Sequence, residues 1–175
     1  MGGVNKGLVS FNGEPLVMSA IKRLRPQVAE LLISANSDLD VYRSFGCEVL
    51  SDAFSGHVGP LAGLHAALLA SRYPVVVAVP CDSPFFPLDL VARLFEAQQN
   101  SGADMVIVQT SGHFHPVFCL CHRRIAPHLG DFIASGGRRV MEWYASVKGI
   151  AVAFDDQKAA FRNINTMEEL SGAMG

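Results

Sequence analysis

The sequence predicts an α/β fold of three layers, in which helices cover both faces of a mostly parallel sheet. Short apolar runs alternate with stretches whose apolar residues recur at helical spacing, and this alternation is typical of repeated strand–helix units. Half of the residues are hydrophobic and only 17% are charged. A run of valines at residues 75–79 indicates a central parallel strand that is buried on both faces. The 175 residues suit a single domain with one hydrophobic core.

Charge and cysteine content narrow the class of protein. The net charge is −2 at pH 7, whereas a protein that binds nucleic-acid polymers usually carries a strong basic excess. No apolar run approaches the roughly 20 residues that a membrane span needs. The chain begins without a signal-peptide pattern, and its four cysteines suit a reducing compartment better than a disulfide framework. We therefore expect a cytoplasmic protein that works on small molecules, with neither a nucleic-acid polymer nor a membrane as its partner.

In the first part of the chain, strands and helices alternate around two tight turns. Asn12-Gly13 is typical of a two-residue hairpin turn, Pro15 suits the first position of a helix, and Pro26 ends that helix. The expected elements are a strand at 8–11, a helix from 15, a strand at 31–33, a short helix at 38–45 and a strand at 47–50.

The remainder of the chain continues the same pattern. Pro60 begins a helix after a glycine-containing loop, and Thr166 with Glu169 forms a capping box at the start of a last helix. The expected elements are helices at 87–99, 125–134 and 138–147, and strands at 75–79, 103–109, 116–121 and 150–154.

Polar residues follow three of these strands, where ligands bind in open α/β sheets. Asn36, Asp52 and Asp82 each come just after a strand, and the two aspartates are one strand–loop–helix–strand unit apart. A pair of carboxylates at one sheet edge suits Mg²⁺, which takes oxygen ligands together with substrate phosphates. Each aspartate alone would equally serve to cap a turn or a helix.

Glycine-rich segments suggest anion binding. Residues 2–7 (GGVNKG) combine adjacent glycines with Lys6, so backbone N–H groups and a positive charge would face a phosphate, although the segment fits no Walker motif. Residues 59–63 (GPLAG) stand at a helix start, where anions are favoured. Arg138 and Arg139 follow two glycines at another helix start and would equally form a solvated helix face. His115 stands before a proline at a strand start, and the spacing of the nearby cysteines disfavours zinc.

These segments together resemble the molybdenum cofactor guanylyltransferases (MobA-type), which belong to the nucleotidyltransferases with a Rossmann-like fold. The resemblance covers nearly the whole chain in the family's order. Its motifs are MGGVNKGL at 1–8, NGEPL at 12–16, GPLAG at 59–63, PCDSP at 80–84, GRRVM at 137–141 and NINTMEEL at 163–170.

The resemblance implies a role for each matching position. Lys6 and Asp82 correspond to the catalytic pair, with Lys6 at the nucleotide phosphates and Asp82 as the Mg²⁺ ligand. Ser34 stands where the family often has an asparagine, two residues before Asn36. The implied nucleotide site comprises Gly2, Gly3, Lys6, Ser34, Asn36, Asp52 and Asp82. The implied pterin side comprises His115, Arg138, Arg139, Asn163 and Asn165.

The chain departs from the family pattern at its front. The family begins with a buried strand that leads into Leu-Ala-Gly-Gly, and this sequence starts at the MGG that follows. We expect the first family strand to be missing from the centre of the sheet. Its neighbours would then expose apolar surface, and the phosphate loop would lose several N–H donors.

The resemblance implies transfer of GMP from GTP to the terminal phosphate of molybdopterin, with release of pyrophosphate and Mg²⁺ as cofactor. Molybdoenzymes or other proteins of cofactor biosynthesis would be partners. Two alternatives stay open: a related nucleotidyltransferase that uses CTP or a sugar phosphate, and a truncated module that binds nucleotide or pterin without catalysis.

Overall fold

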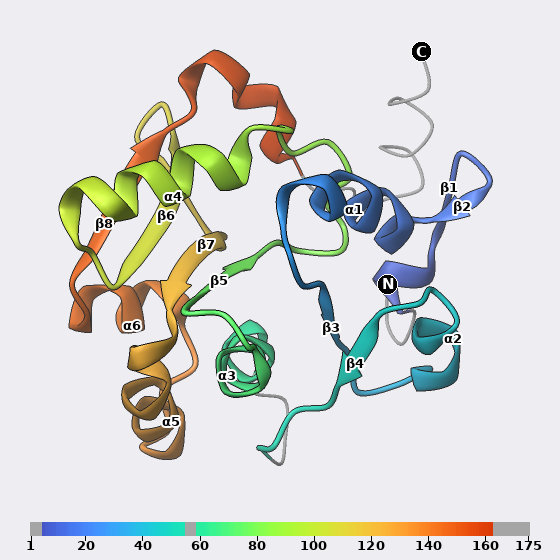
Figure 1. The fold of residues 1–175 in the computed structure, drawn as a ribbon, viewed down its shortest axis with the longest axis horizontal. Helices are drawn as coiled ribbons and strands as arrows, with labels where there is room; N and C mark the ends of the chain where they lie inside the picture. Colours follow the sequence, from blue (N-terminus) through green and yellow to red (C-terminus); the bar gives the residue numbers. More distant parts are fainter. Residues whose placement is uncertain (1–4, 55–58, 163–175) are drawn as a thin grey trace.

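A computed structural model describes residues 5–54 and 59–162. Most of its strands lie in two blocks, a four-stranded sheet and a parallel pair of strands. The two blocks lie side by side, with helices on both faces (Figure 1). The expected helix at Thr166 and Glu169 lies outside the described residues.

The larger block is a four-stranded sheet in the order β5-β7-β6-β8. β7 is antiparallel to both β5 and β6, and β8 is parallel to β6. Three of the four strands therefore run the same way, and the long strand β7 runs against them. The bounds are β5 Val75–Ala78, β6 Met105–Thr110, β7 His113–His122 and β8 Gly149–Ala153.

The smaller block is a parallel pair, β3 Leu32–Ser34 and β4 Glu48–Leu50. The helix between them, α2 Leu39–Arg43, follows the βαβ pattern expected from the sequence. A hairpin precedes this block, β1 Ser10–Phe11 with β2 Glu14–Pro15. Its turn residues Asn12 and Gly13 both have positive φ, as a type I′ turn requires.

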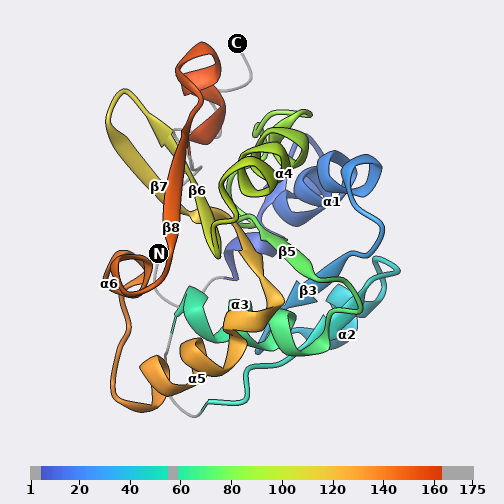
Figure 2. The same cartoon turned by 60° about the vertical axis from the view of Figure 1, so that its left-hand side comes forward.

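Helices lie on both faces of the strands and complete the expected three layers. Figure 2 shows α1 and α4 together on one side and α3 and α5 on the other. The two largest of the four apolar clusters match this arrangement, since one contains residues of α1 and α4 and the other contains residues of α3, α5 and α6. The helix bounds are α1 Leu16–Leu24, α3 Pro60–Ala70, α4 Leu90–Ser101, α5 Ala126–Ala134 and α6 Val140–Ser146.

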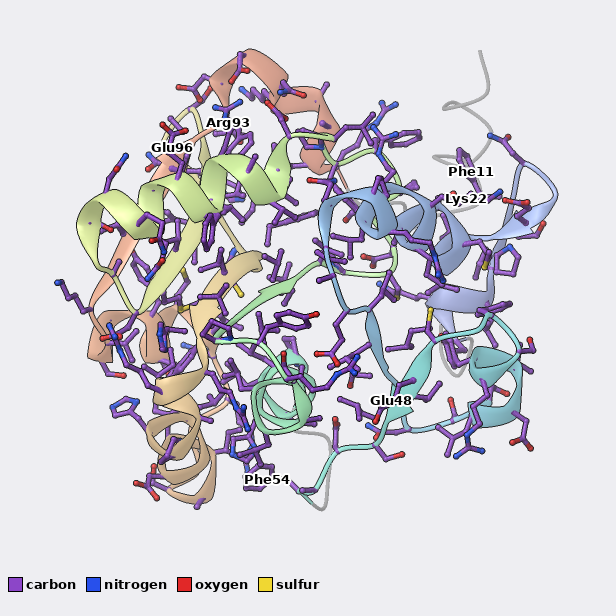
Figure 3. The ribbon with its side chains drawn as sticks, viewed as in Figure 1. Phe11, Lys22, Glu48, Phe54, Arg93 and Glu96 are labelled. Carbon is purple, nitrogen blue, oxygen red and sulfur yellow. The ribbon has the colours of Figure 1, made fainter. Side chains whose placement is uncertain are left out.

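Short 3₁₀ turns complete the chain at four places: η1 Lys6–Leu8, η2 Arg25–Gln27, η3 Arg123–Ile125 and η4 Asp155–Phe161. Arg93 of α4 fixes η4 against the larger block, as Figure 3 shows at the upper edge of the molecule. Its guanidinium lies 3.7 Å from the centroid of the Phe154 ring and 2.9 Å from Asp156 Oδ2. A desolvated cation over an aromatic face is attracted by the ring's quadrupole, so this pair joins the last described turn to the sheet.

The prediction that residues 75–79 form a central parallel strand is wrong in two respects. Among the described strands, β5 hydrogen-bonds with β7 alone and is antiparallel to it, so it is an edge strand of this sheet. All four of its residues are only half-buried, whereas Met105, Val106, Ile107 and Val108 of β6 are fully buried. The apolar run correctly predicted a strand here. Among the described strands, however, β5 has one neighbour, whereas a central strand has two.

Candidate functional site

The carboxyl ends of β3, β4 and β5 open onto one groove of about 940 Å³. Its polar end contains four of the predicted site residues, namely Ser34, Asn36, Asp52 and Asp82. Most of the rest of its wall is formed by apolar residues of β3, β5, α1 and α3. The topology thus brings residues from both blocks to one edge, where α/β sheets bind their ligands.

Asn36 and Asp52 are held together by a reciprocal pair of hydrogen bonds. Asn36 Nδ2 donates to Asp52 Oδ2 at 2.7 Å, and the backbone N–H of Asp52 donates to Asn36 Oδ1 at 3.0 Å. Ser34 Oγ donates to Asp52 Oδ1 at 3.4 Å. Parallel pairing of β3 with β4 places these residues in adjacent positions after the two strands. The cluster fixes the Asp52 carboxylate in one orientation at the mouth of the groove.

Gly63 of α3 lets that helix approach the cluster closely. A Cβ added at this position would lie 2.5 Å from Ser34 Oγ and 3.9 Å from Asp52 Oδ1. The first turn of α3 therefore borders the Ser34–Asp52 pair, and the positive end of the helix dipole favours an anion there. The small residues of the GPLAG motif predicted a close backbone approach at this helix start, and the structure shows that Gly63 makes it, against Ser34.

Lys6, the first residue of η1, forms an ion pair with Asp82, which follows β5. Lys6 Nζ lies 3.5 Å from Asp82 Oδ2, with the aspartate side chain 11% exposed and the lysine 47% exposed. Asp82 follows β5 in a tight loop whose Pro80 and Cys81 also line the groove. The predicted catalytic pair is thus brought together, with its carboxylate largely withdrawn from solvent and its cation facing outward.

The loop that carries Lys6 is anchored by a network that sequence reasoning missed. Tyr42 Oη donates to Asn5 Oδ1 at 2.7 Å, and Asn5 Nδ2 donates to Asp38 Oδ2 at 2.9 Å. Burial raises the pKa of Tyr42 to about 12, so the phenol stays protonated. Gly7 passes so close to Tyr42 and Cys81 that an added Cβ would clash with the phenol oxygen. The only sequence signal for this anchor was the glycine after Lys6.

The donor set at Asp82 suits a hard cation that is shared with substrate. In the described part of the chain, no three histidine, cysteine or acidic side chains gather as a metal-binding group. Mg²⁺ does not require one, since it commonly takes one or two carboxylates and completes its octahedron with waters and substrate phosphates. Asp82 would supply the protein ligand, through a carboxylate that Lys6 also contacts.

His115 lies on β7, next to a local break in the strand pairing. The register between β6 and β7 shifts between Ile107 and Val108, so residues 116–118 form extra length on β7. Pro116 and Val117 consequently line the groove. His115 Nε2 shares a 2.7 Å hydrogen bond with Thr110 Oγ1, and its ring lies 5.4 Å from that of Phe161. Burial lowers the pKa of His115, and nearby His113 lowers it further, so the neutral imidazole is favoured.

Arg138 and Arg139 lie in the connection between α5 and α6. Arg138 Nη1 donates to the carbonyl oxygens of Ile133 at 2.9 Å and Gly137 at 2.7 Å, so this guanidinium caps the end of α5. Arg139 is paired with Glu142 at 3.3 Å and its side chain is 82% exposed. The next residue, Val140, lines the groove. The two arginines thus stand beside the groove, Arg138 with a helix-capping role and Arg139 facing solvent.

Four predicted site residues, Gly2, Gly3, Asn163 and Asn165, lie outside the described residues. The last described residue, Arg162, lies over the ring of Phe85 at 5.1 Å. Phe85 follows Asp82 by three positions, so Arg162 lies close to the Asp82 loop.

All four cysteines are free, as the sequence predicted. Burial raises the pKa of Cys81, and the charge of Asp82 raises it further. A hydrogen bond from Cys121 to Cys119 raises the pKa of Cys121 well above its ordinary value, and complete burial adds to this. Because the thiolate is the reactive form, the structure favours inert thiols at these positions.

The groove at the carboxyl ends of the strands is thus lined by the fixed carboxylate of Asp52 and by Asp82, which Lys6 adjoins. Residues 1–148 match the family model described as "MobA-like NTP transferase domain". The chain belongs to this family, which confirms the resemblance found in the sequence.

Curated relatives carry a more specific description. A protein from Shewanella putrefaciens is 43% identical over 169 residues, covering 97% of this chain and 87% of the relative. One from Cupriavidus necator is 45% identical over 175 residues with the same coverage. Both are described as molybdenum cofactor guanylyltransferases.

Solved structures confirm the fold. Molybdopterin-guanine dinucleotide biosynthesis protein A from Archaeoglobus fulgidus superposes with a TM-score of 0.81 at 22% identity, covering 98% of this chain and 89% of that one. A 2-C-methyl-D-erythritol 4-phosphate cytidylyltransferase from Thermus thermophilus gives a TM-score of 0.73 at 17% identity, covering 96% and 91%. No helix in the described ranges 5–54 and 59–162 is long and apolar enough to cross a membrane.

Proposed function

We propose that this protein transfers GMP from GTP to the terminal phosphate of molybdopterin, forming the guanine dinucleotide cofactor and releasing pyrophosphate. The observation that carries the proposal is the shared groove, which holds the Ser34–Asn36–Asp52 cluster and Asp82 at one edge. The descriptions of the relatives at 43% and 45% identity supply the substrates.

The reaction is a displacement at the α-phosphorus of GTP. A phosphate oxygen of the pterin forms a new bond to that phosphorus, and the bond to the oxygen bridging to the β-phosphate breaks. A phosphate monoester is largely ionised near pH 7, because its second pKa is about 6, so the nucleophile needs no strong general base. The protein's task is alignment and neutralisation of charge.

Three parts of the site would each contribute to this alignment and charge neutralisation. The fixed carboxylate of Asp52, with Asn36, would hold the nucleoside at the β3–β4 side of the groove. Lys6 would balance the charge of the departing pyrophosphate, since it stands beside Asp82 with its ammonium facing outward. The start of α3, brought close by Gly63, adds N–H dipoles on the anionic side.

Mg²⁺ is proposed as the cofactor, with Asp82 as its protein ligand. When bound, such a cation neutralises phosphate charge and orients the reacting oxygens. Asp82 would keep it at the boundary of the two blocks, where Lys6 adjoins the same carboxylate. A protein of this kind would act in the cytoplasm and would deliver its product to molybdoenzymes or to other proteins of cofactor biosynthesis.

The central test replaces Asp82 by alanine. The purified protein is incubated with GTP, Mg²⁺ and molybdopterin, and pyrophosphate and the dinucleotide are measured. We expect Asp82→Ala to lower turnover by at least about 100-fold, the effect of removing a main electrostatic contact in a transition state. The matched control is Asp40→Ala, which removes an equally charged but 96% exposed carboxylate on α2. Near-normal turnover of Asp82→Ala would contradict its role as metal ligand.

Choice of nucleotide is tested by thermal unfolding with GTP, CTP, ATP or UTP in the presence of Mg²⁺. A ligand that binds only the folded state raises the melting temperature. We expect GTP to give the largest rise. Stabilisation by CTP and not by GTP would instead favour a cytidylyltransferase, the activity of the Thermus neighbour. Stabilisation by GTP without any turnover would favour a binding module.

A further inference from the structure

Tyr42 lies near the end of α2 and contacts the chain on both sides of Lys6. Its Oη donates to Asn5 Oδ1 at 2.7 Å, and a Cβ added at Gly7 would lie 2.5 Å from the same oxygen. In Figure 1 the first described residues accordingly lie beside α2. The phenol oxygen therefore holds the residue before Lys6 by a hydrogen bond and the residue after it by close packing.

The hydrogen bonds of Asn5 have a single arrangement. The side chain of Tyr42 is buried, and burial raises its pKa to about 12, so the phenol remains a hydrogen-bond donor at neutral pH. The atom of Asn5 that accepts from it is therefore the amide oxygen, since the amide nitrogen is a donor. That nitrogen is then directed to Asp38 Oδ2 at 2.9 Å and to Ser37 Oγ at 3.3 Å. Both polar atoms of the amide thus have fixed partners.

The same packing lies directly beside the ion pair of the site. A Cβ added at Gly7 would also lie 3.3 Å from Cys81 Sγ. Lys6 precedes Gly7 and Cys81 precedes Asp82, so this contact adjoins the ion pair, in which Nζ and Oδ2 are 3.5 Å apart. Lysine carries its charge on a flexible four-carbon stem. A fixed backbone path is consequently what keeps the ammonium of Lys6 near the carboxylate of Asp82.

The ring and the hydroxyl of Tyr42 have separable parts in this arrangement. The ring packs edge-on against Phe45, with the ring centroids 6.1 Å apart, and belongs to the apolar cluster of the smaller block with Ile33. The hydroxyl makes the contact to Asn5. Tyr42 is absent from the described residues that line the groove, so it would influence a bound substrate only through the chain it holds.

We propose that Tyr42 is a positioning residue for the transfer reaction, whose hydroxyl holds Lys6 beside Asp82 through Asn5 and Gly7. The inference rests on the proposed function, in which Lys6 balances the charge of the departing pyrophosphate. A charge that is already in place lowers the barrier because nothing needs to reorganise at the moment of reaction. Loss of the hydroxyl would let Lys6 move away, which lowers kcat more than it weakens the binding of GTP.

The first test compares Tyr42→Phe with Tyr73→Phe in the full chain. Tyr42→Phe keeps the buried ring and removes its hydroxyl, whereas Tyr73→Phe removes the same group from a 42% exposed residue outside the groove. Steady-state kinetics are measured with GTP, Mg²⁺ and molybdopterin. We expect Tyr42→Phe to lower kcat by about tenfold, as loss of alignment does, at a nearly unchanged KM for GTP. Tyr73→Phe should change neither, and a normal kcat in Tyr42→Phe would overturn the proposal.

A double variant tests whether the hydroxyl acts through Lys6. In Lys6→Met the ammonium is absent, so the further change Tyr42→Phe should lower kcat no more. Two changes that act through one group are non-additive, whereas independent changes add. The same additional loss of kcat in the Lys6→Met background would show a general structural role for the hydroxyl and would overturn the proposal.

The contact between Asn5 and Asp38 allows a rescue. Asn5→Asp places two carboxylates side by side and should lower kcat as Tyr42→Phe does. Adding Asp38→Asn restores a donor opposite an acceptor, and Tyr42 still has an oxygen to which it donates. The φ of Asp38 is +52°, a conformation that asparagine also adopts. The double variant should therefore recover most of kcat, and a lack of recovery would contradict the network.

Amide hydrogen exchange tests the positioning without substrate. The N–H of Leu8 donates to the carbonyl oxygen of Asn5 at 3.0 Å, and that of Val9 to the carbonyl oxygen of Lys6 at 3.2 Å. In Tyr42→Phe these two amides should exchange up to about tenfold faster, the equivalent of one hydrogen bond, while those of β6 stay unchanged. If the unsubstituted protein transferred no GMP, the proposed function would fail, and exchange would still decide this inference. Faster exchange confined to the Lys6 turn would support it, and unchanged exchange would overturn it.

Discussion

The two blocks of this protein differ in how completely their strands are buried. In the larger block, Met105 to Val108 of β6 are fully buried between helices on both faces. In the smaller block, only Ile33 of β3 is buried, while Leu32 is half-exposed and Ser34 is exposed. The candidate site residues are divided between the blocks, because Asp82 follows β5 of the larger block and Asn36 and Asp52 follow the strands of the smaller one.

This difference indicates that one block supplies stability and the other supplies an adjustable part of the site. The sheet of the larger block has an apolar core on each face. In the smaller block, the core residues Val17, Ile21 and Ile33 also line the open groove. Low local packing is the physical basis of local opening. Matched substitutions in the two blocks should therefore lower the free energy of unfolding by different amounts.

The largest expected effect distinguishes the two cores. Ile107→Ala removes a fully buried side chain of β6 and should lower the free energy of unfolding by about 3 kcal/mol or more, since a closed core leaves a cavity. Ile33→Ala removes the same atoms beside the open groove and should cost about 1–2 kcal/mol, because little new cavity is created. Urea unfolding measures both. Equal losses would show that the two blocks are packed alike.

A second prediction concerns the contact between the blocks at Gly63. Gly63→Ala would place a Cβ 2.5 Å from Ser34 Oγ and 3.0 Å from Ser34 Cβ, so the Ser34 side chain must rotate away or α3 and β3 must move apart, with a cost of about 1–3 kcal/mol. Nucleotide binding should weaken at the same time. The double variant with Ser34→Ala removes the nearest atom and should recover part of the stability. Absence of any recovery would place the strain elsewhere.

A third prediction concerns the smaller block's share of the site. Asn36→Ala removes both hydrogen bonds to Asp52 and should raise the KM for the nucleotide by about tenfold, equivalent to about 1.4 kcal/mol. kcat should change little, since the Lys6–Asp82 pair stays in place. Steady-state kinetics separate these effects. A fall in kcat at unchanged KM would assign Asn36 to the chemical step instead.

The smallest effect concerns pH and lies in the larger block. Burial lowers the pKa of His65 and of His115, so the unfolded chain binds protons at these positions before the folded chain does. Stability should therefore decrease as the pH falls below the ordinary histidine value of about 6.5. Unfolding free energies between pH 7.5 and 5.5 measure the slope.

His65→Leu provides the matched variant for this slope. His65 Nδ1 is buried without a hydrogen-bond partner among the described residues, so leucine removes a titrating group without breaking a bond. The dependence on pH should become shallower while the stability at pH 7.5 is kept. An unchanged slope would assign the pH dependence to other groups.

Much of the element order followed from local sequence signals. Asn12-Gly13 predicted the hairpin turn, Pro60 predicted the start of α3, and Gly102 ends α4 in the left-handed conformation. These signals act through φ restrictions and the missing N–H of proline, which need no distant partner. The placement of Asn36, Asp52 and Asp82 after strands was likewise visible in the sequence, and the structure brings them to one groove.

Other features depend on partners far along the chain. Tyr42 contacts Asn5 across 37 positions, and no local pattern marks such a pair. Arg138 follows two glycines and suggested an anion site, yet it donates to the carbonyl oxygens at the end of α5. Helix ends leave carbonyl groups without partners, and only the course of the chain decides which guanidinium reaches them.

The amino-acid sequence alone determined the order of most strands and helices along the chain. It also determined the apolar character of residues 75–79 and which polar residues follow the strands. Only the tertiary structure decided that β7 inserts antiparallel between β5 and β6, and that β5 pairs with β7 alone among the described strands. Strand pairing joins residues such as Val76 and Cys121, whose meeting depends on the whole packed sheet. Periodicity reports which faces need burial, but it does not specify which neighbour provides it.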